Sequence, residues 1–227
     1  MKKNILWGVV ALLAGSLSAA DSSPKDQVAA AAKKLADEPN YSWRTTVVVP
    51  ESAQFKPGPT EGRTEKDGFT HINMSFGDNK TEAVLKGDKA SVMGPEGGWR
   101  SVSELEGDQG PGRFLGRFIR NFKTPAAHAV ELVSGLKEIK KDGEVFSGEL
   151  TDEGAKAQFR FGTPSNAKGS AKFWLKDGVL SKFEFKVQGK VDFNGNEVDV
   201  DRTTTVEIKD VGTTQVQVPE EAKKKLT

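Results

Sequence analysis

Histidine and cysteine supply many metal and catalytic sites, and this chain has two histidines and no cysteine. A transition-metal site would therefore need carboxylate ligands, and no thiolate nucleophile is available. His71 alternates with apolar residues in a strand-like segment, whereas His128 lies in a helical one. We expect both imidazoles to be solvated on the surface rather than to act as catalytic or metal-binding groups.

Carboxylates gather in the segment DFNGNEVDVD, residues 192–201. Its glycine spacing does not match that of a calcium loop, so we interpret it as the tip of a β-hairpin. The segment GDQGPGR lacks the Lys-Ser/Thr pair of a phosphate-binding loop and is interpreted as a flexible connection. No serine after residue 20 lies in a nucleophile-elbow motif. We therefore expect a protein that is not an enzyme and that uses no cofactor and no metal.

A single apolar face dominates residues 171–210, which read as three adjoining strands. Asn194-Gly195 is a strong signal for a two-residue hairpin turn. It predicts that Phe183 pairs with Val206 on the apolar face, while lysines face carboxylates on the other face. The sequence therefore predicts a half-buried antiparallel sheet.

The turn before this hairpin contains Asp177-Gly178. A two-residue Asp177-Gly178 turn would set Phe173 against Lys182 and so mix apolar and charged residues on each face. A three-residue loop over 176–178 keeps the faces separate and pairs Phe173 with Ser181, so the pattern favours it.

Arg202 falls on the apolar face, where the predicted register places it opposite Val187. A buried guanidinium is costly unless it is hydrogen-bonded. We expect it to bind a carboxylate, a carbonyl or water, or else to extend along an edge into solvent.

Other segments have clear patterns. In FTHINMSF the side chains Ile72, Met74 and Phe76 alternate with polar ones, as in a half-buried strand. We predict further elements as follows: helices over 24–37, 124–135 and about 151–157, a strand over 41–49, a Pro/Gly-rich loop over 50–62 and a last strand over 213–219.

Residues 113–122, RFLGRFIRNF, predict a basic amphipathic helix. Phe114, Phe118 and Phe122 form a stripe, because residues four apart lie on one helix face. Arg113, Arg117 and Arg120 lie on the other side. The stripe could pack on the sheet, close as a lid over an apolar cavity, or lie on a membrane surface.

The N-terminus has the order of a secretory signal peptide: two lysines, the apolar run ILWGVVALLAG and a small-residue end, SLSAA. The apolar run is too short to span a bilayer. Cleavage after Ala20 would remove two lysines and no acid, so the formal net charge of +1 becomes −1. We expect a soluble periplasmic or secreted protein, with no nucleic-acid partner.

The order of the segments resembles that of the LolA/LppX-like superfamily of exported lipid and lipoprotein carriers. The resemblance covers about residues 41–219, and its marks are GDKASVMGPEGGW ending at Trp99, the hairpin FWLKDGVLSKF and a last segment ending in Val218-Pro219. No lipid-anchoring cysteine is present. The resemblance implies an α+β fold: a curved antiparallel sheet, or incomplete β-barrel, with helices covering its concave face.

The predicted organisation is a signal peptide (1–20), an N-terminal helix (21–40) and a single half-barrel domain (41–227) with a helical insertion near 101–135. The resemblance implies a carrier that binds an apolar or lipidated ligand between sheet and helices. We expect a monomer, with a transient contact with membranes as a further role. The alternative is a non-enzymatic interaction or scaffolding protein with a packed interior. The candidate ligand-binding residues are Phe114, Phe118, Phe122, Ile72, Met74, Phe76, Phe183, Phe185 and Arg202.

Overall fold

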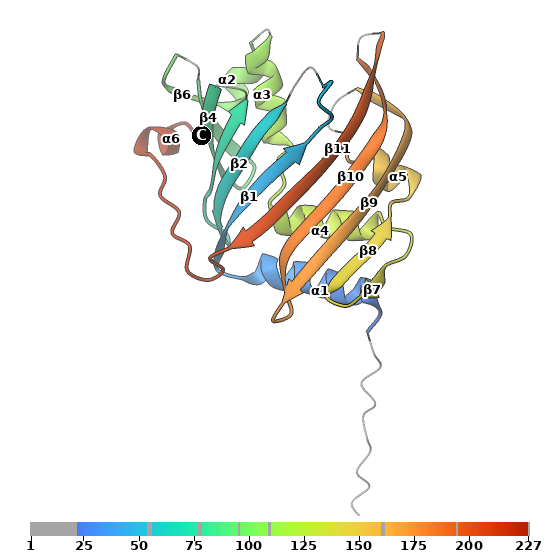
Figure 1. The fold of residues 1–227 in the computed structure, drawn as a ribbon. Coiled ribbons are helices and arrows are strands. Elements are labelled where there is room, and N and C mark those ends of the chain that lie inside the picture. The colour runs from blue at the N-terminus through green and yellow to red at the C-terminus, as the bar shows by residue number, and fades with distance from the viewer. Residues whose placement is uncertain are drawn as a thin grey trace, which may run out of the picture.

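One continuous antiparallel sheet forms the frame of the protein (Figure 1). The computed structural model describes residues 22–53, 56–76, 79–94, 96–108, 110–159, 162–193 and 195–226. The predicted signal peptide lies outside the described residues. The 11 strands run in the order β6-β5-β4-β3-β2-β1-β11-β10-β9-β8-β7, so β6 and β7 are opposite edges and the sheet is not closed into a barrel.

The first six strands are β1 (Asn40–Val48), β2 (Pro57–Glu65), β3 (Thr70–Phe76), β4 (Asn79–Lys86), β5 (Lys89–Met93) and β6 (Trp99–Ser101). The other five are β7 (Lys140–Asp142), β8 (Val145–Glu149), β9 (Thr163–Lys176), β10 (Val179–Phe193) and β11 (Asn196–Lys209). The described residues also form six helices: α1 (Pro24–Asp37), α2 (Val102–Glu106), α3 (Pro111–Arg120), α4 (Pro125–Ser134), α5 (Asp152–Lys156) and α6 (Glu220–Lys224).

Helices α1 to α5 lie on the concave face of the sheet, which confirms the predicted fold class (Figure 1). The Ser23 hydroxyl caps α1 by accepting a hydrogen bond from the Asp26 amide. Its small apolar stripe, Val28, Ala31, Ala32 and Leu35, is buried against α4 and the sheet. Short side chains let this helix lie close to its neighbours.

The core fills most of the space between sheet and helices. Phe173 and Phe183 are fully buried on neighbouring strands, with ring centroids 6.3 Å apart, and Phe185 continues the stack at 6.5 Å from Phe183. Leu132 of α4 and Ile119 of α3 belong to the same cluster. Burial of such side chains is the main stabilising term of a fold of this kind.

The β10–β11 hairpin has the predicted register. Phe183 pairs with Val206, and Phe185 pairs with Thr204. Lys190 faces Asp199 on the opposite side of the sheet, as expected from the charge pattern.

The predicted β9–β10 loop is wrong. Lys176 pairs directly with Val179, so the turn has two residues, and both Asp177 and Gly178 have positive φ, 53° and 73°. A register shift between Leu180 and Lys182 marks Ser181 as a β-bulge. The extra residue restores the faces, so Phe173 pairs with Phe183. The structure thus has a two-residue turn followed by a β-bulge, where the sequence had predicted a three-residue loop.

The Pro/Gly-rich segment 50–62, predicted as a loop, overlaps strand β2, so its residues 57–62 are corrected from loop to strand. Gly62 pairs with Trp43 of β1, and a Cβ at position 62 would overlap the indole ring. The glycine therefore provides the space in which the large aromatic side chain lies flat on the neighbouring strand.

The predicted last strand, residues 213–219, is also wrong. This segment has no regular structure and crosses the convex face of the sheet as a strap that ends in α6 (Figure 1). The Thr214 amide donates to Asn40 Oδ1 at 2.7 Å, and the Ser91 hydroxyl donates to the Ala222 carbonyl at 3.1 Å. Ala222 is fully buried in a second apolar cluster with Val84 and Trp99.

We predict that Gly62→Ala lowers the free energy of unfolding by about 1–3 kcal/mol, because the added methyl group must displace the Trp43 ring. Urea unfolding followed by circular dichroism measures the change. Gly94→Ala is the control, because its Cβ would lie 3.5 Å from its nearest neighbour. Equal effects of the two substitutions would contradict the prediction.

We also predict that Ala222→Asp releases α6, because the carboxylate would enter an apolar cluster without a cationic partner and would lower stability by about 2 kcal/mol or more. Hydrogen exchange of residues 211–226 and thermal unfolding measure the release. Lys224→Asp, at an exposed position of the same helix, is the control. Unchanged protection of the strap in Ala222→Asp would refute this arrangement.

Candidate functional site

A cleft of about 960 Å³ opens on the helix side of the sheet, and we call it the α4 cleft. Its walls come from five places: the end of α1, the β1 residue Tyr41, the β2–β3 hairpin, the β4–β5 hairpin and the start of α4. Phe122, in the connection between α3 and α4, lines it as well. Segments from most of the chain therefore meet at this opening.

The floor of the α4 cleft carries hydroxyl groups that are already hydrogen-bonded. The Tyr41 side chain is 3% exposed, and its hydroxyl accepts a hydrogen bond from the Ala126 amide at 3.4 Å. Burial raises the pKa of this hydroxyl, and hydrogen bonds with Thr124 and Ala126 act in the opposite direction. The buried hydroxyls of Thr64 and Thr70 bond to each other at 2.7 Å. These groups can therefore face an apolar molecule without losing hydrogen bonds.

The wall of the α4 cleft is apolar. Phe122 stacks on the buried Trp43 with a centroid distance of 6.1 Å, and this contact fixes its ring. Val130 of α4 lines the cleft and is 45% exposed, so it is one of four large hydrophobic side chains that are exposed among the described residues. Leu85 and Leu226 complete the apolar lining.

The rim of the α4 cleft is charged and nearly balanced. Its cations are Lys66, Lys86 and Lys89, and its anions are Glu38, Glu65, Asp67 and Asp88. Lys66 pairs with Asp37 at 3.0 Å, and the Lys86 ammonium lies 4.8 Å from the Phe69 ring centroid. The rim therefore has no strong preference for one sign of charge.

Among the predicted ligand-binding residues, Phe122 is the one that lines the α4 cleft. The others whose side chains are described lie elsewhere, and their role in binding stays a prediction. Ile72, Met74, Phe183 and Phe185 are at most 4% exposed in the core. Phe114 is 45% exposed on α3, and Phe118 of the same helix is half-buried. The side chain of Phe76 lies outside what the structure describes.

Arg202 is half-buried and joins a polar network between α4, α5 and β11. Its guanidinium donates to the Gln158 carbonyl, one of the partners expected from the sequence. The Gln158 amide oxygen lies 2.9 Å from His128 Nε2. His128 packs edge-on against Phe183 and Phe185, with centroid distances of 5.7 and 5.0 Å. The expectation of a solvated His128 was therefore wrong.

His71 is also less solvated than expected. Its side chain is 13% exposed, and Nε2 lies 3.1 Å from Glu82 Oε2 on the neighbouring strand. The pair lies on the convex face and belongs to the cross-strand polar contacts of the sheet.

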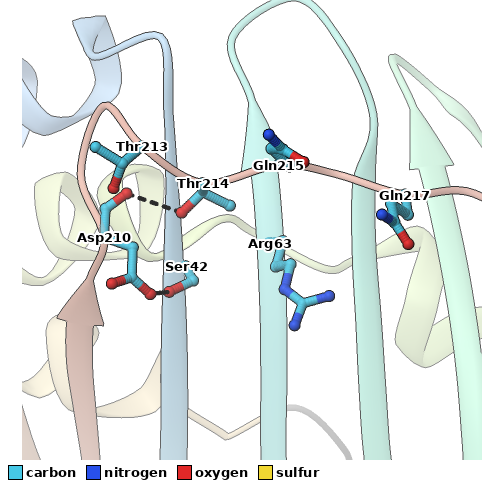
Figure 2. Close-up of a pocket in the computed structure, with 7 residues that line it drawn as sticks. All are labelled: Ser42, Arg63, Asp210, Thr213, Thr214, Gln215 and Gln217. Carbon is cyan, nitrogen blue, oxygen red and sulfur yellow. Dashed lines mark hydrogen bonds between the residues drawn. The ribbon is translucent and has the colours of Figure 1, made fainter.

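A second opening lies on the convex face beneath the strap, and we call it the polar groove (Figure 2). It measures about 470 Å³. Ser42 donates to Asp210 Oδ2 at 2.9 Å, and the Thr214 hydroxyl donates to the Asp210 carbonyl at 2.8 Å. Arg63, Gln215 and Gln217 line the rest. This lining does not suit an apolar ligand, and the sequence had not pointed to it.

Neither metal chemistry nor a membrane span is indicated in the described part of the chain. It contains no group of three or more His, Cys, Asp or Glu side chains that could hold a metal ion. The carboxylate-rich hairpin tip is used locally: Glu197 pairs with Lys190 at 2.9 Å and raises the pKa of that lysine. No described helix is long and apolar enough to cross a bilayer.

Comparisons with known proteins agree with this fold. No family model and no curated protein matches the sequence. Among solved structures, lipoprotein LppX from Mycobacterium tuberculosis superposes with a TM-score of 0.50 at 11% identity, covering 86% of this chain and 98% of that chain. LprF from Mycobacterium bovis gives 0.48 at 12% identity, with 88% and 100% covered.

A LolA superfamily protein from Nitrosomonas europaea gives a TM-score of 0.37 at 11% identity, with 91% and 98% covered. At such identities the likeness concerns the fold and not the ligand. The open sheet, the helices on its concave face and the match to LppX over nearly the full length agree with the resemblance seen in the sequence. The chain has a fold like that of LppX.

Proposed function

We propose that this protein is an exported carrier that binds a lipid or a lipidated ligand in the α4 cleft. The observation that carries the proposal is the exposed apolar wall around Phe122 and Val130, inside a cleft of about 960 Å³. Ligand pockets span about 300–1,000 Å³ and combine apolar walls with a few polar groups. The floor hydroxyls and the charged rim fit that description.

The chemistry of the cleft favours an acyl chain over a polar ligand. Tyr41, Thr64 and Thr70 already have hydrogen-bond partners within the protein, so little polar recognition is available in the floor. Burial of an acyl chain against Val130 and Phe122 would remove apolar surface from water on both molecules. The charged rim would then face the headgroup.

The proposal includes the cellular setting expected from the sequence. We propose a signal peptide over 1–20, cleavage near Ala20, a single domain with a helical insertion, and a monomeric protein in the periplasm or outside the cell. The absence of cysteine from the chain fits a carrier without a lipid anchor of its own. We also propose that the protein is not an enzyme, because the candidate site is described by the shape of its cleft and its apolar wall and not by catalytic side chains.

A second candidate is a scaffolding protein with a packed interior. It is favoured by the full burial of Phe173, Phe183 and Leu132, which fill the space between α4 and the centre of the sheet. On this alternative the α4 cleft is a surface irregularity that binds nothing. The two candidates differ in one measurable property, which is affinity for lipid.

We predict that the protein binds a fluorescent fatty acid and that Val130→Trp weakens binding at least about tenfold, because an indole would occupy the α4 cleft. Val130 is 45% exposed, so the larger side chain need not disturb the core. Val48→Trp is the matched control, at a β1 position that is 66% exposed and does not line the cleft.

Fluorescence titration measures the affinity, and mass spectrometry of organic extracts identifies any lipid that co-purifies with the protein. Finding neither co-purifying lipid nor fatty-acid binding would refute the carrier and favour the scaffold. Equal loss in both tryptophan variants would place the ligand outside the α4 cleft.

A further inference from the structure

We propose that the outer face of α3 docks on the surface of an anionic lipid bilayer. This goes beyond the carrier proposal, because a membrane contact through α3 does not depend on what the α4 cleft holds. The helix runs from Pro111 to Arg120 and combines an exposed aromatic side chain with exposed arginines. Short helices of this composition lie in the plane of the interface when their apolar face enters the headgroup layer.

Phe114 provides the apolar part of the docking face, because its side chain is 45% exposed. Phe118, one turn later on the same stripe, is half-buried and packs against the core. Ile119 is fully buried and, with Leu115, anchors α3 to the core. The helix therefore keeps its place on the protein through one side while Phe114 remains accessible on the other.

The charge around α3 is complementary to anionic lipid. The three carboxylates of the preceding segment, residues 102–108, are each held by a cation: Glu106 binds Arg120 of α3 through both oxygens, Asp108 binds Arg100, and Glu104 binds Lys225. Within the part of the chain that the structure describes, no ion pair involves either of the two remaining arginines of the helix, Arg113 and Arg117. Both are exposed.

After these pairings, Arg113 and Arg117 give the surface around α3 a local excess of positive charge. The net charge of the whole chain is near zero and does not indicate this local excess. A basic side chain near an anionic bilayer contributes attraction that decays within a Debye length, so the contact should weaken with added salt. An aromatic side chain between two arginines would add insertion to this attraction, and neither would suffice alone.

The docking face is continuous with the candidate binding site. Phe122 follows α3 by two residues and lines the α4 cleft, while Phe114 faces solvent near the other end of the helix. The six residue steps from Phe114 to the end of α3 at Arg120 rise about 9 Å. A docked α3 would therefore hold the mouth of the cleft within a short distance of the lipid headgroups.

The test is sedimentation of the protein with sucrose-loaded vesicles, using the form recovered from the soluble fraction of cells. Vesicles of equal parts phosphatidylglycerol and phosphatidylcholine are compared with vesicles of phosphatidylcholine alone. We expect binding to the anionic vesicles only, and we expect it to fall as salt is added. Arg113→Gln combined with Arg117→Gln should weaken binding about 10- to 30-fold, and Phe114→Ser should weaken it about tenfold.

Matched controls separate this face from the rest of the surface. Arg63→Gln combined with Lys168→Gln removes two exposed cations elsewhere on the sheet, and Val48→Ser removes an exposed apolar side chain. Circular dichroism checks that each variant is folded. The proposal is overturned if the wild-type protein does not bind anionic vesicles, if neutral vesicles bind it equally, or if the controls lose as much affinity as the α3 variants.

If α3 binds a protein partner instead of a membrane, the wild-type protein should not bind anionic vesicles. Vesicle binding and fatty-acid binding are also separable, because Val130→Trp should leave sedimentation with vesicles unchanged. If a variant loses fatty-acid binding but still binds vesicles, the result concerns the carrier proposal and leaves the membrane-docking proposal unaffected.

Discussion

The first strand of the sheet is hydrogen-bonded to the last, and this pairing joins two halves that are each built from consecutive neighbours. Thr45 pairs with Val206 and Trp43 with Ile208, across more than 160 residues of chain. Without the β1–β11 contact, β1 to β6 and β7 to β11 would be two separate sheets with unprotected edges. Both the shared concave face and the cleft at its end exist because the two halves continue each other.

The concave face is covered unevenly, and this unevenness leaves room for a site. Helix α1 and helix α4 bury the phenylalanines of β9 and β10, where aromatic side chains fill the space. Beside the start of α4 the space toward the β2–β3 and β4–β5 hairpins stays open, and small side chains, Ala126 and Ala127, line it there.

Much of the fold followed from pattern and turn chemistry, and the failures have physical causes. The register of β10 and β11 was predictable because a two-residue turn and opposite charges specify it together. The β9–β10 turn was misjudged because a bulge at Ser181 changes the parity of the strand, and no sequence signal at Ser181 marks such an insertion. Strand β2 was missed because its glycine reads as a loop signal in the sequence. In the structure Gly62 instead leaves space for the ring of Trp43, a residue of another strand.

The candidate site was less predictable than the fold. Apolar periodicity finds side chains that face the interior, but it does not distinguish a packed interior from an open one. Phe122 was identified, whereas Tyr41 and Val130 were not, because the cleft forms where loops from distant segments meet. Leu226 follows the segment that was predicted as the last strand, and no pattern in the sequence placed it beside the cleft.

The position of the strap has a consequence for the order in which the chain can fold. Its contacts with Asn40, Ser91 and Trp99 tie the last residues to strands from the first half of the sequence. The amino-terminal half therefore cannot complete its structure until translation has reached the carboxyl terminus. Such late, long-range closure slows folding, because contacts between segments far apart in the sequence must form before the sheet is complete.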